Sequence, residues 1–136
     1  MAKVSFIEAI RQAQYEELER DTNVFLMGED LVCNVFGTTT GFLDAFGPER
    51  IKDTPISEEG FVGAAAGASM VGMRPIVDLT IASFVYQAMD QVCSIIAKSR
   101  YIYGGQAKLP LVLRMCMFYG NANAAQHSDR PYPMFM

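Results

Sequence analysis

Short apolar runs alternate with helical patterns along this 136-residue chain, and that alternation constrains its fold more than any other feature. The runs cover residues 23–27, 50–53, 76–81 and 109–118, and the first, at five residues, is too short for a helix. One helical pattern precedes the first run, and one lies in each of the three gaps between runs. Strands that alternate with helices form βαβ units. The sequence therefore predicts an α/β fold, a mostly parallel sheet with helices on both faces.

Four helices are expected between and before these strands. The first begins with a capping box, because Ser5 is followed three residues later by Glu8. A short helix, FLDAF, should stop at residues 47–48, which are Gly-Pro. The last and longest carries an apolar stripe and ends at the Gly-Gly pair 104–105; the stripe consists of Val85, Met89, Val92 and Ile96.

The stretch 53–72 is the most unusual part of the chain, because a glycine-rich helix follows an extended Thr-Pro segment. Ser57 is the expected N-cap, and Glu58 then lies where the helix dipole favours negative charge. Each internal glycine costs a helix roughly 0.5–1 kcal/mol relative to alanine. Close approach of another helix, a partner subunit or a flat ligand would explain such a face, and so would ordinary packing of the helix on the sheet. The small residues are Gly60, Gly63, Ala64, Gly67, Ala68 and Val71.

Composition excludes several classes of function. The net charge is −4 without a Lys/Arg cluster, which argues against binding to nucleic acid. Charged residues make up only 19% of the chain, and nine Met and nine Phe favour buried contacts with a partner. The three cysteines are scattered and have no metal-ligand spacing, so reduced thiols in the cytoplasm are expected. No signal peptide or membrane-spanning run is expected either.

Four chemically useful residues follow the ends of expected strands or lie close to them: Glu29, Glu58, Phe84 and His127. Ligands of open α/β folds bind at that edge of the sheet. Together these residues offer two carboxylates, an aromatic plate and a titratable base. One histidine and scattered acids do not make a metal site, and no phosphate-binding glycine motif is present. Solvated loop residues remain the alternative interpretation of Glu29 and of His127.

Several segments resemble one family: GED (28–30), the run 46–78, MDQ (89–91), AKSRYIYGGQ (97–106) and AAQHSDRPYP (124–133). They resemble the beta subunit of the thiamine-diphosphate-dependent first component of 2-oxo acid dehydrogenase complexes, of the pyruvate, acetoin and branched-chain types. The resemblance implies that residues 1–136 are a transketolase-like pyrimidine-binding domain with the thiamine-diphosphate-binding fold. Because only RPYPMFM follows the loop after the last strand, we expect the domain to be incomplete at its C-terminal end.

The resemblance also implies roles for individual residues. Glu58 matches the glutamate that contacts the N1′ nitrogen of the cofactor's aminopyrimidine, and Phe84 matches the aromatic residue that stacks on that ring. His127 matches a histidine at the mouth of the active site, suited to proton handling near neutral pH. The implied catalytic residues are Glu58 and His127, and the implied cofactor-binding residues are Glu29, Ile56, Ser57, Glu58, Phe84 and Gln87.

The same resemblance implies partners. An alpha subunit would hold the diphosphate and magnesium in an α2β2 heterotetramer, and a lipoyl acyltransferase component would accept the acyl group. The small-residue helix face would then be a contact with the alpha subunit. Leu111 matches a potassium-binding position of some relatives, but we predict no metal site in this chain.

This sequence departs from the family in two ways. Family members are more than twice as long, and they carry an apolar or small residue where this chain has Glu59, which we expect to point away from Glu58. Two alternatives remain: a non-catalytic, truncated chain that self-associates, and a transketolase-type or deoxyxylulose-phosphate-synthase-type enzyme acting on sugar phosphates. The sequence does not determine which 2-oxo acid, or acetoin, is the substrate.

Overall fold

The computed structural model describes residues 3–136 and contains one four-stranded sheet, in which every neighbouring pair of strands is parallel. The strand order is β2-β1-β3-β4, so the two central strands are β1 and β3. The strands are β1 (Val24–Gly28), β2 (Ile51–Asp53), β3 (Arg74–Ile81) and β4 (Val112–Cys116). The predicted α/β class and parallel sheet are confirmed.

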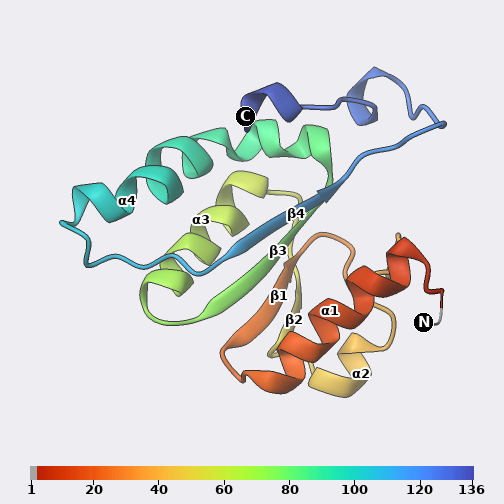
Figure 1. Ribbon diagram of the computed structural model, residues 1–136, viewed down its shortest axis with the longest axis horizontal. Coiled ribbons are helices and arrows are strands. Elements are labelled where there is room, and N and C mark those ends of the chain that lie inside the picture. Colours follow the sequence, from red (N-terminus) through yellow and green to blue (C-terminus); the bar gives the residue numbers. More distant parts are fainter. Residues whose placement is uncertain (1–2) are drawn as a thin grey trace.

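Helices cover both faces of this sheet, as Figure 1 shows. One face carries α1 (Phe6–Arg20) and α2 (Phe42–Phe46), and the other carries α3 (Glu58–Met70) and the segment that ends in α4 (Ala97–Ile102). The expected capping of α1 is confirmed, because the Ser5 hydroxyl accepts the Glu8 N–H at 3.1 Å. The expected ends of α2 are also confirmed, since Gly41 and Gly47 flank it.

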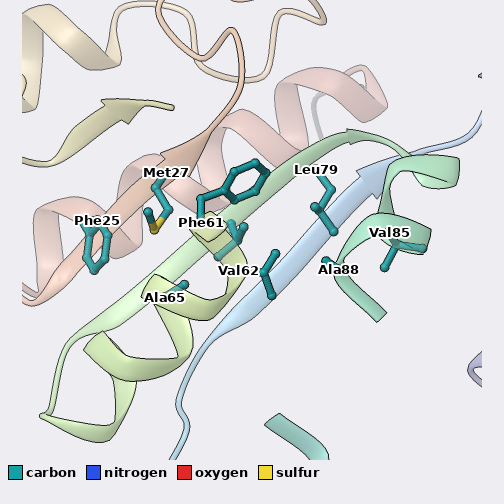
Figure 2. Packing of buried hydrophobic residues seen from close by; sticks show 9 residues of the cluster. Phe25, Met27, Phe61, Val62, Ala65, Leu79, Val85 and Ala88 are labelled. Atoms are coloured by element: carbon teal, nitrogen blue, oxygen red, sulfur yellow. The ribbon is translucent and has the colours of Figure 1, made fainter. Parts of the chain in front are cut away.

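Alternate residues of β1 point to opposite faces of the sheet and so belong to two separate cores. Val24 and Leu26 join the core under α1 and α2, where Phe42 is fully buried. Phe25 and Met27 join the core under α3 (Figure 2). A strand buried on both faces reads as one continuous apolar run, which is why residues 23–27 were recognisable in the sequence.

The chain after β3 differs from the single long helix that was predicted. It begins as the 3₁₀ segment η1 (Ala82–Ala88), continues as the π-helical segment η2 (Gln91–Ile96) and only then becomes α4. Side chains three apart line up in a 3₁₀ helix, and Ala82, Val85 and Ala88 are all completely buried. The tight winding therefore buries one face of η1, whereas an α-helix would rotate Ala88 off the line of Ala82 and Val85.

The predicted limits of the third and fourth strands were also wrong. The third strand begins at Arg74 rather than at residue 76, because Arg74 donates its N–H to Asn23 O at 2.9 Å, directly before β1. The fourth covers only 112–116, because Pro110 has no N–H and the chain there makes a tight turn from Leu111 N–H to Leu109 O.

The edge strand β4 is less well covered than the rest of the sheet. An apolar groove of about 910 Å³ lies between α1 and β4, and a second of about 550 Å³ lies between β4, η2 and the C-terminal segment. No helix within residues 3–136 combines the length and the apolar character needed to cross a membrane.

Candidate functional site

Two acidic residues meet where β1 ends and α3 begins. Glu29 directly follows the last residue of β1, and Glu58 is the first residue of α3. Glu58 is only 7% exposed, which is unusual for a glutamate. Ser57 takes the N-cap position, as predicted, but its side chain makes no capping hydrogen bond, because its backbone (φ −168°, ψ 67°) does not direct the hydroxyl to the first turn.

The electrostatics of Glu29 show that the two carboxyls are neighbours. Burial is the main cause that raises the pKa of Glu29, and the charge of Glu58 raises it further. A hydrogen bond from the Ser57 backbone N–H acts in the opposite direction. Among the residues that the structure describes, one carboxyl oxygen, Glu29 Oε1, is buried without a hydrogen-bond partner. Protonation of Glu29 is therefore easier in the folded chain than in water, and its neighbour is the buried Glu58.

Phe84 and His127 form a second pair at the same edge of the sheet. Phe84 lies in η1, just beyond the end of β3, and is half-buried. The His127 ring packs against it with a centroid distance of 5.4 Å and an interplanar angle of 78°. This T-shaped contact is a favourable arrangement of two aromatic rings. Residues 43 positions apart in the sequence are brought together because β4 runs parallel to β3 and both strands end at this edge of the sheet.

Two residues that were not singled out from the sequence lie beside the histidine loop, and one of them is hydrogen-bonded to it. The Ser83 hydroxyl donates to the carbonyl oxygen of Gln126, the residue before His127. Tyr86 lies near Asp129, two residues after the histidine. Burial is the first cause that raises the pKa of this phenol, and the charge of Asp129 raises it further. Both lie in η1 beside Phe84, but only the tertiary contact reveals their role.

The remaining expected site residues lie on the surface. Ile56 is 86% exposed, and Ser57 and Gln87 are exposed as well. A planar ligand held by Glu58 and Phe84 would therefore remain open on one side within this chain. Within residues 3–136, no group of three or more His, Cys, Asp or Glu side chains could hold a metal ion.

The small-residue face of α3 points away from the sheet. Phe61, Val62 and Ala65 pack on the sheet, whereas the exposed positions are Gly60, Ala64, Gly67 and Val71. Ala68 packs against the sheet core and Gly63 faces Gln91 of η2, so packing within the chain accounts for part of the small-residue face. Glu59 also lies on this outer side, exposed and accepting a 3.4 Å hydrogen bond from Gln91 of η2, in agreement with the expectation that it points away from Glu58.

Comparison with known proteins gives one family. The model of the pyrimidine-binding domain of transketolase matches residues 2–136.

Curated relatives match almost the whole chain. The pyruvate dehydrogenase E1 component subunit beta of Rickettsia felis is 44% identical over 93% of this chain. The 2-oxoisovalerate dehydrogenase subunit beta and the acetoin:2,6-dichlorophenolindophenol oxidoreductase subunit beta of Bacillus subtilis are each 39% identical over 99% of it. The chain covers 40%, 42% and 44% of these three relatives, respectively.

Proposed function

Because this chain belongs to the transketolase pyrimidine-binding domain family, we propose that it supplies the aminopyrimidine half of a thiamine diphosphate site in a 2-oxo acid dehydrogenase. The proposed reaction is oxidative decarboxylation of a 2-oxo acid, with acyl transfer to a lipoyl partner. The similarity to three beta subunits named for such enzymes or for an acetoin oxidoreductase supports this reading.

The observation that carries the proposal is the burial of Glu58 at the start of α3, next to Glu29. A buried carboxyl at that edge suits a ligand nitrogen with which it can share a proton. In the proposed site Glu58 holds that proton at the N1′ atom of the aminopyrimidine, while the half-buried Phe84 ring lies against the heterocycle. Thiamine diphosphate, when bound, supplies a nucleophilic carbon that attacks the 2-oxo acid and accommodates the electrons released by decarboxylation.

His127 is the proposed proton-transfer residue. Its ring is half-buried against Phe84, so it lies beside the position assigned to the cofactor ring. An imidazole can give or take a proton near neutral pH, as acyl transfer to a lipoyl group requires. Glu29, Ile56, Ser57 and Gln87 complete the proposed pocket wall.

An alpha subunit is the proposed partner, in an α2β2 heterotetramer. It would close the open side of the site and hold the diphosphate with its magnesium ion. The outward face of α3, with Gly60 and Gly67 exposed, suits close approach of a partner helix. We propose a cytoplasmic location, supported by the fact that Cys33, Cys93 and Cys116 are all free thiols.

The decisive experiment compares two neighbouring substitutions. The chain, extended to the length of its relatives, is co-expressed with the alpha subunit, and binding of thiamine diphosphate and decarboxylation are measured for Glu58→Gln and Glu59→Gln. Glu58→Gln should lose activity by a factor of about 10²–10⁴, the usual contribution of a positioned acid or base. Glu59→Gln should behave like the wild type, because Glu59 is exposed and, among the described residues, its one hydrogen bond comes from Gln91.

Equal activity of the two variants would refute the role given to Glu58. Assays with pyruvate, acetoin and branched 2-oxo acids would then identify the substrate of the active complex. Gly67→Leu tests the partner face separately, because among the described residues nothing lies within 4 Å of a Cβ added there. It should block assembly with the alpha subunit, and unchanged assembly would exclude that contact.

The apolar grooves beside β4 favour one alternative, a non-catalytic chain that self-associates. Sedimentation of the 136-residue chain over a range of concentrations tests it. Reduction of a lipoyl substrate by an extended chain but not by the 136-residue chain, each with its alpha subunit, would support this alternative.

A further inference from the structure

Three buried oxygen atoms near the candidate site have no hydrogen-bond partner among residues 3–136: Glu29 Oε1, Thr54 Oγ1 and Thr80 Oγ1. Buried polar atoms of this kind are rare, because each has lost its water and gained nothing in return. Glu29 follows β1 and Thr80 lies near the end of β3, so the two come from the adjacent central strands of the sheet.

Glu29 and Thr80 line the same small cavity. Its volume is about 10 Å³, close to the ~10–15 Å³ that one water molecule requires. Thr38 lines it too, and the Thr38 hydroxyl accepts a 3.1 Å hydrogen bond from Arg114, which leaves its own proton to donate. The cavity therefore offers a carboxyl oxygen and two hydroxyls, within the two to four polar partners that a buried water needs.

The backbone of Thr80 is bent in a way that accounts for its place in this cavity. Its φ is +59°, a conformation that a β-branched residue rarely adopts. The pairing of β3 with β4 shifts between Asp78 and Ile81, and the Thr80 N–H donates to Asp78 Oδ1 at 2.9 Å. Asp78 is in turn paired with Arg114. This bulge brings Thr80 to the wall that it shares with Glu29.

We propose that one ordered water occupies this cavity, donating to Glu29 Oε1 and accepting from the Thr80 hydroxyl, and that Thr80 is thereby a positioning residue for the Glu29 carboxyl. The water satisfies both buried oxygens at once. The role of this water in catalysis rests on the proposed function, because it depends on Glu29 lying beside Glu58. The presence of the water in the cavity does not depend on the proposed function.

The charges around Glu29 define what the water does. Burial, the Glu58 charge and the Asp30 charge all raise the pKa of Glu29, and only the Ser57 N–H opposes them. Across the cavity, the charge of Asp78 is balanced by Arg114. A water that donates to Oε1 favours the ionised carboxylate, so its loss should raise this pKa further.

The test reads the water and the carboxyl directly, without cofactor or partner. Crystal structures at a resolution that shows ordered solvent are determined for the wild-type 136-residue chain, Thr80→Val and Thr80→Ser, and the pKa of Glu29 is measured by carbon NMR of its carboxyl. Valine keeps the shape and removes the hydroxyl, whereas serine keeps the hydroxyl and serves as the matched control.

We expect one solvent peak within about 3 Å of both oxygens in the wild type and in Thr80→Ser. In Thr80→Val the peak should be lost and the pKa of Glu29 should move upward. A dry cavity in the wild type, or an unchanged pKa in a folded Thr80→Val, would overturn the proposal. If Thr80→Val does not fold, the wild-type solvent map alone decides whether the water is present. Because none of these measurements involves catalysis, a failure of the proposed function would leave them unaffected.

Discussion

Gly28→Ala should disrupt the sheet where the candidate site begins, since Gly28 ends β1 and precedes Glu29. A Cβ atom at this position would overlap the Asp78 carbonyl oxygen of β3 and lie 3.0 Å from its carbonyl carbon. Backbone atoms of a central strand cannot move aside as a side chain can. The glycine also has φ +157°, which L side chains rarely adopt.

The expected cost follows from these two effects. Overpacking a well-packed interior costs typically about 1–3 kcal/mol, and a side chain forced into a disfavoured backbone conformation adds about 1–2 kcal/mol. Together they predict a loss of about 2–5 kcal/mol, a large part of the ~5–15 kcal/mol that stabilises an ordinary domain. At about 4 °C per kcal/mol, Tm should fall by about 8–20 °C.

Urea denaturation followed by circular dichroism measures this loss, with Gly67→Ala as the matched control. Gly67 lies in α3 with nothing within 4 Å of an added Cβ, so alanine there should stabilise the protein by about 0.5–1 kcal/mol. A loss below about 1 kcal/mol for Gly28→Ala, beside the expected gain for Gly67→Ala, would refute the argument that β1 and β3 approach too closely for a side chain.

Three further predictions concern single side chains. Arg50→Met should destabilise the fold by about 3 kcal/mol in the same denaturation assay, because the Arg50 guanidinium donates to three backbone carbonyls at the junction of α1 and β1. Arg100 is exposed, so the control Arg100→Met should change the stability little. Glu29→Gln should alter the pH dependence of stability, because folding raises the pKa of the Glu29 carboxyl. The carboxyl therefore favours the folded state most at pH values below its ordinary pKa of 4.5, and this contribution is lost as the pH rises through the folded-state pKa. The wild type should therefore lose stability relative to Glu29→Gln over that range, and parallel curves would contradict the raised pKa. Ser83→Ala should speed amide hydrogen exchange in residues 124–129 around His127, with unchanged exchange in β1, and equal protection in wild type and variant would show that the Ser83 hydroxyl does not hold the loop.

Local elements of this protein are determined by residues close together in the sequence. The Ser5 hydroxyl needs only the N–H three residues later to start α1, and the glycines around α2 end it by their own backbone freedom. Strand β1 is recognisable because both of its faces are buried, so polar residues do not interrupt it. The class of fold and the identity of Glu58, Phe84 and His127 as candidate residues follow from such local patterns and from the family resemblance.

Tertiary structure alone decided what these residues contact. Periodicity showed that α3 has a small-residue face but not which way it points, because the face packed on the sheet is chosen by the larger Phe61 and Val62. The start of the predicted long helix became the 3₁₀ segment η1, because Val85 and its neighbours fill one side of a core built from other strands. The shared cavity of Glu29 and Thr80 depends on the pairing of β1 with β3, which are separated by β2 and α3 in the sequence. Such pairings depend on packing across the whole domain, and no local pattern encodes them.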